Sequence, residues 1–286
     1  MQRIIVPVDF SDTSAAAVRF GTYLAETMNL DLNIVHVFDT MLSTSQTISN
    51  RVRELEKERI GKQLTDFARR NVEPVLSTFQ GRLDLLPNVK TAALEGAAAQ
   101  TILWESTKED VALIVMGGVG AGAGLHPPGI FGGVARTLAL RSGCPLILIP
   151  KEYGYPQVER LAIAFDGVDD IRRMAAFSRR VIKALHPEVH FVHVREQDHL
   201  TEARRDDEFL DLACGANFPS YTYKFDALPH GKVTEELLAY TERERINLLV
   251  LGGERRSFFE RLFEAGHLAP LVKRCTVPML IIPFDR

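Results

Sequence analysis

The stretch Arg3-Ile4-Ile5-Val6-Pro7-Val8-Asp9-Phe10 is a short apolar run that ends in a carboxylate. It returns later in the chain as Arg160-Leu161-Ala162-Ile163-Ala164-Phe165-Asp166-Gly167, so that Asp9 and Asp166 lie 157 residues apart. The pair Ile34-Val35-His36-Val37 and Phe191-Val192-His193-Val194 keeps this spacing. Two later pairs of blocks follow in the same order, at spacings of 135 and 133 residues: 113–118 with 248–253, and 145–150 with 278–283. Four matched blocks in one order indicate a unit written twice, the second copy being 24 residues shorter.

Within each copy, short apolar runs alternate with helical patterns. In the first copy the runs predict strands at 4–8, 32–38, 90–94, 111–116 and 146–149. Helices are expected after Ser11, which offers an N-cap oxygen together with Asp12 and Thr13, and at about 47–70, 97–107 and 131–141. Strands separated by helices predict an α/β fold with parallel sheets and right-handed crossovers.

The repeat sets the domain organisation. We expect two tandem doubly wound domains, residues 1–150 and 158–286, joined by a short linker at 151–158 that carries Gly154 and Pro156. A shorter second helix, at about 202–214, accounts for most of the reduced length of the second domain.

Composition and charge exclude several classes of protein. The 286 residues are 46% hydrophobic and 25% charged, with a net charge of −3 and a pI near 6.3, which argues against both disorder and a strongly basic nucleic-acid-binding protein. No apolar run reaches the ~20 residues that cross a bilayer, and the N-terminus has no signal-peptide pattern. The three widely spaced cysteines fit neither a disulfide framework nor a zinc site. We therefore expect a soluble, cytoplasmic protein without a nucleic-acid or membrane partner.

A glycine-rich stretch, residues 117–133, follows the fourth strand of the first copy. Glycine allows backbone N–H groups to approach a phosphate closely, and the helix expected from about Phe131 adds the positive end of its dipole. A glycine-rich surface loop without a ligand is the alternative, and composition does not decide between them. In an open parallel sheet, ligands bind beyond the carboxyl ends of the strands, which is where this stretch lies.

Two other phosphate motifs fit poorly. Gly118-Val-Gly120-Ala-Gly-Ala123 matches the dinucleotide pattern formally, but it leads into Pro127-Pro128 and no acidic residue follows near position 143. Gly231-Lys232 resembles the end of a P-loop, but the earlier glycine is replaced by Asp226 and the next residue is Val233. We therefore predict neither a dinucleotide-binding motif nor a P-loop.

The chain resembles the universal stress protein family in its tandem two-domain form. The resemblance covers residues 1–150 and 158–286 and rests on Val6-Pro7-Val8-Asp9, Val35-His36-Val37, Val115-Met116-Gly117, the glycine stretch and Cys144-Pro145-Leu146-Ile147-Leu148-Ile149. It implies Rossmann-like domains of the adenine-nucleotide alpha-hydrolase type, each with a five-stranded parallel sheet covered by helices on both faces. One branch of the family binds ATP through the pattern G-x2-G-x9-G-[ST], and another branch lacks both the pattern and the binding.

The resemblance implies an imperfect ATP or adenine-nucleotide site in the first domain. Asp9 matches the adenine-reading aspartate, and Gly117 and Gly120 match the first two glycines of the pattern. The later pair, Gly132-Gly133, comes after eleven residues instead of nine and lacks the hydroxyl of the pattern. The full set of expected site residues is Pro7, Val8, Asp9, Val37, Met116, Gly117, Gly120, Gly132, Gly133 and Val134. We expect binding in the micromolar range or poorer.

The second domain departs further from the pattern. Asp166, Val194, Leu251 and Gly252 match, but Arg255 replaces the second glycine and Ala265-Gly266 replaces the later pair. A side chain there takes up the space that a phosphate needs, so we expect a vestigial site without nucleotide. For Asp166 we favour capping of the following helix, an alternative that stays open for Asp9.

The positions of the histidines and the lack of catalytic motifs argue against a metalloenzyme and against a hydrolase. His36 and His193 occupy equivalent strand positions without partner ligands, and we interpret them as hydrogen-bonded structural residues. No nucleophile-elbow, zinc or dithiol motif occurs. The leading hypothesis is a non-catalytic stress-response protein with at most one nucleotide site and no metal. The alternatives are an adenylyl- or phosphoryl-transfer enzyme of the same superfamily, for which only Asp9 and His126 offer chemistry, and a scaffold that binds no nucleotide.

The last apolar strand of each copy, residues 145–150 and 277–283, would leave an open sheet edge. Because last strands meet in dimers of the resembled family, we expect an intrachain pseudo-dimer in which these two strands run antiparallel. Association of two chains into a homodimer stays open.

Overall fold

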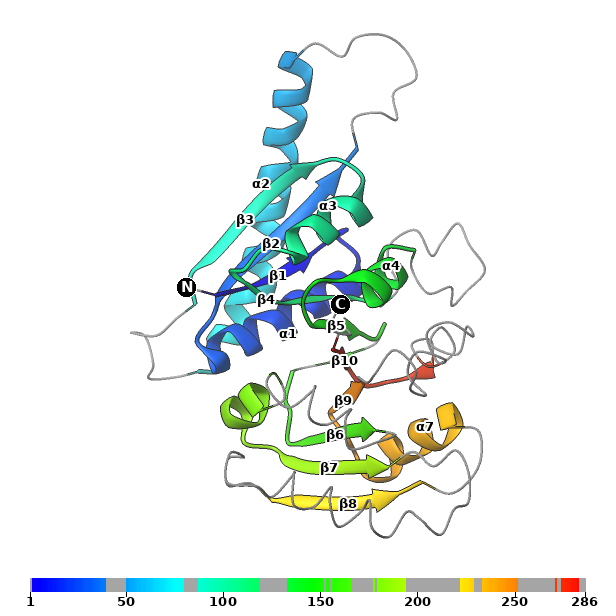
Figure 1. The fold of residues 1–286 in the computed structure, drawn as a ribbon. Helices are drawn as coiled ribbons and strands as arrows, with labels where there is room; N and C mark the ends of the chain where they lie inside the picture. Colours follow the sequence, from blue (N-terminus) through cyan, green and yellow to red (C-terminus); the bar gives the residue numbers. More distant parts are fainter. Residues whose placement is uncertain are drawn as a thin grey trace. The chain divides into compact units, whose positions relative to one another are not determined.

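The computed structural model describes residues 2–39, 50–79, 87–118, 133–151, 153–154, 156–165, 177, 179–193, 222–228, 233–251, 271 and 274–282. The chain divides into two compact units, Met1–Pro156 and Gln157–Arg286, which are called unit 1 and unit 2 below. Each unit is built on a parallel sheet (Figure 1). The predicted α/β class, with two doubly wound parallel-sheet domains in tandem, is confirmed.

Unit 1 alternates strands and helices along its described residues. The elements are β1 (Arg3–Pro7), α1 (Asp12–Met28), β2 (Asp31–Phe38), α2 (Asn50–Leu76), β3 (Val89–Glu95), α3 (Ala98–Ser106), β4 (Val111–Gly117), α4 (Gly133–Arg141) and β5 (Leu146–Ile149). The apolar runs predicted the strands to within one residue at each end.

The unit 1 sheet has the order β3-β2-β1-β4-β5, with every neighbouring pair parallel. The chain winds outward from β1 through β2 to β3, and then returns to β4 on the other side of β1. The strand order therefore reverses between β1 and β4. In doubly wound sheets this reversal opens a crevice at the carboxyl ends of the strands.

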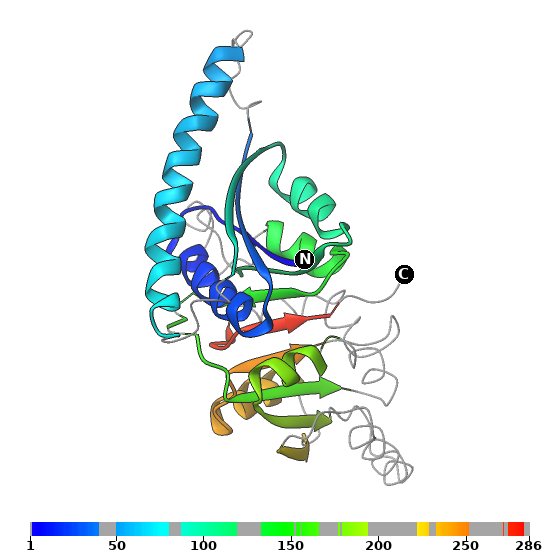
Figure 2. The same ribbon diagram turned by 90° about the vertical axis from the view of Figure 1, so that its left-hand side faces the viewer.

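Helices cover both faces of the unit 1 sheet. Figure 2 shows α2 and α1, in cyan and blue, on one side and the green α3 and α4 on the other. Helix α2 continues to Leu76, beyond the predicted end near residue 70, although Pro74 lies inside it. Proline removes one helical hydrogen bond, but Val75 is fully buried, so packing on the core keeps the last turn helical.

Unit 2 repeats the parallel arrangement over its described residues. Its elements are β6 (Arg160–Phe165), β7 (Glu188–His193), β8 (Tyr223–Ala227), α7 (Val233–Arg243), β9 (Leu248–Leu251) and β10 (Met279–Ile281). The strand order is β10-β9-β6-β7-β8, with parallel pairs throughout. The shortened helix expected near 202–214 lies outside the described residues.

Both cores are built from the central strands, whose aliphatic side chains are almost fully buried. Cys144 and Cys275, predicted to be small buried hydrophobes, are 5% and 3% exposed. Burial raises the pKa of each thiol to about 11. No helix in the described part of the chain is long and apolar enough to cross a membrane. The expected pairing of the two last strands stays a prediction.

Candidate functional site

The carboxyl ends of β1, β2 and β4 meet at one edge of the unit 1 sheet. Pro7 at the end of β1 pairs with Val35 of β2, and Ile5 of β1 pairs with Ile114 of β4. Asp9 follows β1, and Met116 and Gly117 end β4, so these residues flank the reversal of strand order. This edge is where a doubly wound sheet binds its ligands.

Three of the expected side chains share one face of the sheet. Gly21 of α1 packs directly over Val6, since a Cβ at Gly21 would lie 2.7 Å from Val6 Cγ2, and it also adjoins Leu32 and Val115. Successive side chains of a strand point to opposite faces. The face away from α1 therefore carries Pro7, Val37 and Met116. Together they form an apolar wall beside the end of β1.

Asp9 is held by the residue that caps α1. Its Oδ1 accepts hydrogen bonds from the backbone N–H of Ser11 at 3.1 Å and from the Ser11 hydroxyl at 2.6 Å. The Ser11 hydroxyl accepts in turn from the N–H of Ser14 at 3.2 Å, which makes Ser11 the N-cap of α1. The cap predicted from Ser11 is confirmed, and Asp9 acts on the cap through Ser11 rather than as the cap itself.

An aromatic cluster fixes the backbone around Asp9 from the other face. His36 Nδ1 lies 2.8 Å from the carbonyl oxygen of Val8. The ring of Phe10 packs on His36 with centroids 4.6 Å apart and meets Phe67 edge-on at 5.4 Å. The interpretation of His36 as a hydrogen-bonded structural residue is confirmed, and its partner is the peptide that precedes Asp9.

Phe10 itself has a backbone φ of 64°. This left-handed conformation is unusual for a bulky residue and marks strain of a kind often found at functional sites. The sequence gives no sign of it, because glycine and asparagine are the residues that usually adopt such angles. The hydrogen bonds between Asp9 and Ser11 were also not predicted from the sequence, although a carboxylate two residues before a serine N-cap could have suggested them.

Gly117 is required by close packing rather than by backbone angle. A Cβ at this position would lie 2.7 Å from Cγ2 of Thr13, in the first turn of α1. The next residue, Gly118, donates its backbone N–H to the carbonyl of Ile149 at 2.9 Å, which anchors the chain as it leaves β4. The first turn of α1 and the end of β4 are therefore in direct contact at the site.

Gly133 is the first residue of α4, and Val134 follows it half-buried. Gly133 is exposed, and a Cβ added there would meet no atom of the described residues within 4 Å. The described part of the chain thus leaves room for a side chain at this position.

Several expected residues lie outside the described part of the chain. Gly120 and Gly132, with the stretch between them, belong to this group. So do most of the second-domain counterparts: Asp166, Val194, Gly252, Arg255, Ala265 and Gly266. Leu251 ends β9 and is fully buried. The expected asymmetry of the two sites stays a prediction.

The described geometry places a carboxylate and an apolar wall at the same edge of the sheet. Such a pair suits a flat, mostly apolar ring that carries an N–H donor at its edge, because the carboxylate accepts the hydrogen bond and the wall covers the ring face. Among the described residues, no group of three histidine, cysteine or acidic side chains is arranged to hold a metal ion.

Comparison with known proteins assigns the chain to a family. The model of the universal stress protein family matches residues 1–150. No curated protein matches the chain significantly. Among solved structures, a universal stress protein from Archaeoglobus fulgidus DSM 4304 is 16% identical with a TM-score of 0.69, covering 99% of this chain and 96% of its own.

Two further structures show the range of similarity. A putative universal stress protein from Pseudomonas aeruginosa UCBPP-PA14 is 12% identical with a TM-score of 0.61, and the match covers 99% of this chain and 93% of that one. A universal stress protein solved in complex with cAMP is 19% identical with a TM-score of 0.37, covering 53% of this chain and 98% of its own. At these identities the two longer matches show a shared fold over the whole chain.

Proposed function

Because the chain belongs to the universal stress protein family, we propose that it is a non-catalytic stress-response protein whose unit 1 binds an adenine nucleotide weakly. The observation that carries the proposal is the shared position of Asp9, Val37 and Met116 at the carboxyl ends of three adjacent strands. They flank the point where the strand order reverses.

Asp9 is the residue that would select the base. A carboxylate accepts a hydrogen bond from the exocyclic amino group of adenine, whereas a base with a carbonyl oxygen at that position places two acceptors against each other. The bonds from Ser11 hold the carboxylate in place before any ligand arrives. Pro7, Val37 and Met116 would cover one face of the ring.

Calorimetry on the full chain tests the proposal, with ATP, ADP and ITP as ligands. We expect ATP and ADP to bind in the micromolar range or more weakly, and ITP, which has an oxygen in place of the adenine amino group, to bind less well. Asp9→Ala should weaken ATP binding about ten- to hundred-fold, because it removes a charge-assisted hydrogen bond worth about 1.5–3 kcal/mol.

Asp12→Ala is the matched control, because Asp12 is exposed and lies in the first turn of α1, the helix that begins just after Asp9. Both variants remove one negative charge from the same end of α1. Equal affinities for the two variants would refute the role of Asp9, and absence of any binding to the wild type would favour a scaffold without nucleotide. Steady turnover of ATP that is abolished by Asp9→Ala would favour an enzyme.

A further inference from the structure

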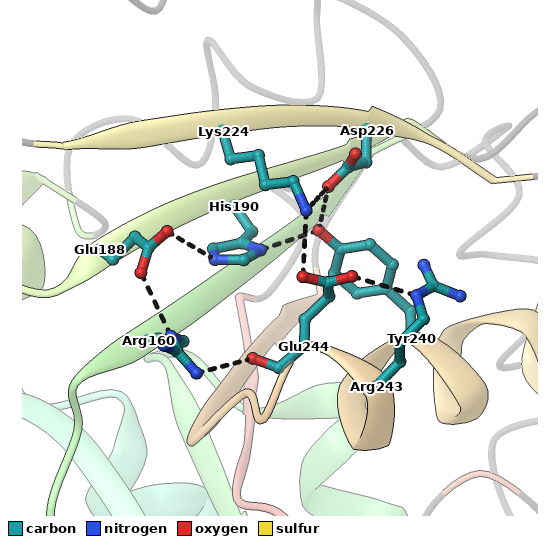
Figure 3. A network of polar contacts seen from close by, with 8 residues as sticks. All are labelled: Arg160, Glu188, His190, Lys224, Asp226, Tyr240, Arg243 and Glu244. Atoms are coloured by element: carbon teal, nitrogen blue, oxygen red, sulfur yellow. Dashed lines mark hydrogen bonds and ion pairs between the residues drawn. The ribbon is translucent and has the colours of Figure 1, made fainter.

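Unit 2 contains a network of polar side chains that the proposed site does not use. Arg160 and Glu188 begin β6 and β7, Lys224 and Asp226 lie along β8, and the other members come from α7 and the residue after it, apart from His190 of β7 (Figure 3). The eight members are Arg160, Glu188, His190, Lys224, Asp226, Tyr240, Arg243 and Glu244.

Four of these residues form a continuous chain, in which His190 and Tyr240 are buried and the two carboxylates at its ends are partly exposed. The Tyr240 hydroxyl donates to Asp226 Oδ2 at 2.5 Å. His190 Nδ1 lies 2.8 Å from the same hydroxyl, and His190 Nε2 lies 3.4 Å from Glu188 Oε1. The chain of contacts therefore runs from a carboxylate on β7, through an imidazole and a phenol, to a carboxylate on β8.

The remaining residues return the chain to its start. Lys224 Nζ bridges Asp226 at 3.2 Å and Glu244 at 3.0 Å. Arg160 donates to the backbone carbonyl of Glu244 at 3.3 Å and to Glu188 Oε2 at 3.2 Å. Arg243 adds a bond to the other oxygen of Glu244 at 3.0 Å. The result is a ring of contacts that joins three strands to α7.

Counting protons identifies the weak point of this ring. Three gaps separate Glu188, His190, Tyr240 and Asp226, and each gap needs one proton to form a hydrogen bond. With both carboxylates ionised, as carboxyl groups are at neutral pH, a neutral imidazole and a phenol supply two protons. The gaps of 2.5 and 2.8 Å have hydrogen-bond length, whereas the third is 3.4 Å. The missing proton is thus the one between His190 Nε2 and Glu188.

Burial explains why the ring lacks this proton. His190 and Tyr240 are 2% and 1% exposed. Removal from water lowers the pKa of His190, and the charge of Lys224 lowers it further, while Glu188, Asp226 and Glu244 oppose these effects. Burial and the bond to Asp226 raise the pKa of Tyr240, so the phenol keeps its proton. His190 is therefore neutral at neutral pH, and its Nε2 atom, which faces Glu188, is the position where the imidazole takes up a proton as the pH falls.

We propose that this ring is an acid-responsive device: uptake of one proton at His190 Nε2 completes the hydrogen bond to Glu188 and closes the circuit that links β6, β7, β8 and α7. At neutral pH, His190 is the Nδ1–H tautomer, donates to Tyr240 and turns a lone pair toward Glu188. In mild acid it becomes an imidazolium that donates to both neighbours.

Nitrogen-15 NMR of the histidine side chains in the full chain tests the proposal. His190→Gln identifies the His190 signals among those of the eight histidines. We expect the Nδ1–H tautomer at pH 7.5 and protonation at a pH below that of a histidine exposed to water. The Nε2 proton should become visible as it joins the bond to Glu188. An Nε2–H tautomer or an imidazolium at pH 7.5, or no protonation before acid unfolding, would overturn the proposal.

Two matched variants distinguish the effect of Glu188 on His190 from the effect of removing any nearby negative charge. Glu188→Gln removes the charge that faces His190 Nε2, whereas Glu159→Gln removes an exposed charge immediately before β6. We expect protonation of His190 to require a lower pH in Glu188→Gln and to stay unchanged in Glu159→Gln. The same response in both variants would overturn the proposal. Both substitutions affect partly exposed carboxylates, and the unchanged signals of the other histidines would confirm that each variant is folded.

Discussion

Each unit has a polar cluster that links the arginine at the start of its first strand to the helix before its fourth strand, but the chemistry of the two clusters differs. In unit 1, Arg3 bridges Asp110 at 2.8 Å and Glu105 at 3.3 Å, and Lys108 bridges Glu105 at 2.6 Å. The bond between Arg3 and Asp110 raises the pKa of the arginine and lowers that of the carboxyl group. Arg3 and Asp110 therefore keep their charges between pH 5 and pH 8, so the ion pair between them does not respond to mild acid.

Unit 2 replaces a charge of this cluster with a buried phenol. Arg160 corresponds to Arg3 at the repeat spacing of 157 residues, and Tyr240 corresponds to Glu105 at the spacing of 135. His190 stands where unit 1 has Asn33. The duplicated fold thus keeps the location of a polar cluster while exchanging its chemistry. At this location unit 2 has a histidine, whereas the described cluster of unit 1 has none.

Truncation of Tyr240 should have the largest effect on this comparison. Tyr240→Ala removes a fully buried ring and the centre of the unit 2 network, and we expect it to destabilise unit 2 by about 3–5 kcal/mol. Peptide-resolved labelling of thiols in urea measures the loss, because Cys144 and Cys275 report separately on the two units. Cys275 should become reactive at lower urea, while Cys144 should be little changed.

Phe20→Ala supplies the matched control, because Phe20 is a fully buried aromatic residue of α1 in unit 1. This variant should expose Cys144 before Cys275, the reverse of the order expected for Tyr240→Ala. Simultaneous exposure of both thiols in either variant would mean that the two units unfold together. The expectation that each variant destabilises only its own unit would then be wrong.

Adding a hydroxyl at the start of α4 should increase the difference in ATP affinity between the two units. Gly133→Ser places a hydroxyl where the ATP-binding pattern has one, and the described residues leave room for it. A hydrogen bond to a charged phosphate is worth about 1.5–3 kcal/mol, so we expect ATP affinity to rise about ten- to hundred-fold in calorimetry. Gly154→Ser, between β5 and β6, serves as a control that should not raise affinity, because this glycine is also exposed and a Cβ there would meet no described atom within 4 Å. No gain for Gly133→Ser would contradict the placement of the phosphates near α4.

The sequence predicted the framework well because apolar runs determine which segments are buried strands. Residues 146–149 form β5 with the predicted bounds, and the other unit 1 strands differ from prediction by at most one residue at each end. The end of α2 was predicted too early, near residue 70, because burial of Val75 on the core sustains the helix to Leu76. A local pattern cannot weigh such tertiary packing.

The candidate site was only partly predictable for a related reason. The positions of Asp9, Val37 and Met116 follow from strand ends, which the sequence indicates. The positive φ of Phe10 and the contact of Gly117 with Thr13 depend on how a helix meets a strand. Likewise, His190 and Tyr240 lie 50 residues apart, and neither belongs to a recognisable motif. Pairs of this kind become visible only when the fold brings their elements together.

A change of pH should affect unit 2 more than unit 1. The pKa of His190 is lowered in the folded state, so between that pKa and about 6.5 the unfolded chain binds more protons. Unit 2 therefore loses stability as the pH falls below about 6.5, by about 1.4 kcal/mol for each pH unit within this window, and the loss ends once folded His190 is protonated. Hydrogen exchange in α7 and β7, corrected for its intrinsic pH dependence, measures the change.

His190→Gln should remove this part of the pH dependence, because glutamine does not titrate. Exchange in α1 and β4 of unit 1 should be the same in the variant and in the wild type. A pH dependence of unit 2 that is unaltered in His190→Gln would assign the effect to other groups, and the contrast between the two polar clusters would no longer explain it.

The smallest expected effect concerns the turn that leads from the first strand to the first helix of each unit. Unit 1 has Phe10 there, with a φ of 64°, whereas Gly167 stands at the matching position of unit 2. Phe10→Gly and Phe10→Ala both remove the ring contacts with His36 and Phe67, but only glycine adopts a positive φ without a steric penalty. We therefore expect the glycine variant to be more stable than the alanine variant by about 1 kcal/mol, the approximate cost of a left-handed conformation for a residue with a Cβ. Labelling of Cys144 in urea measures the difference. An alanine variant as stable as the glycine variant would show that the backbone relaxes once the ring is lost, and that the packing of Phe10 on His36 imposes the left-handed turn.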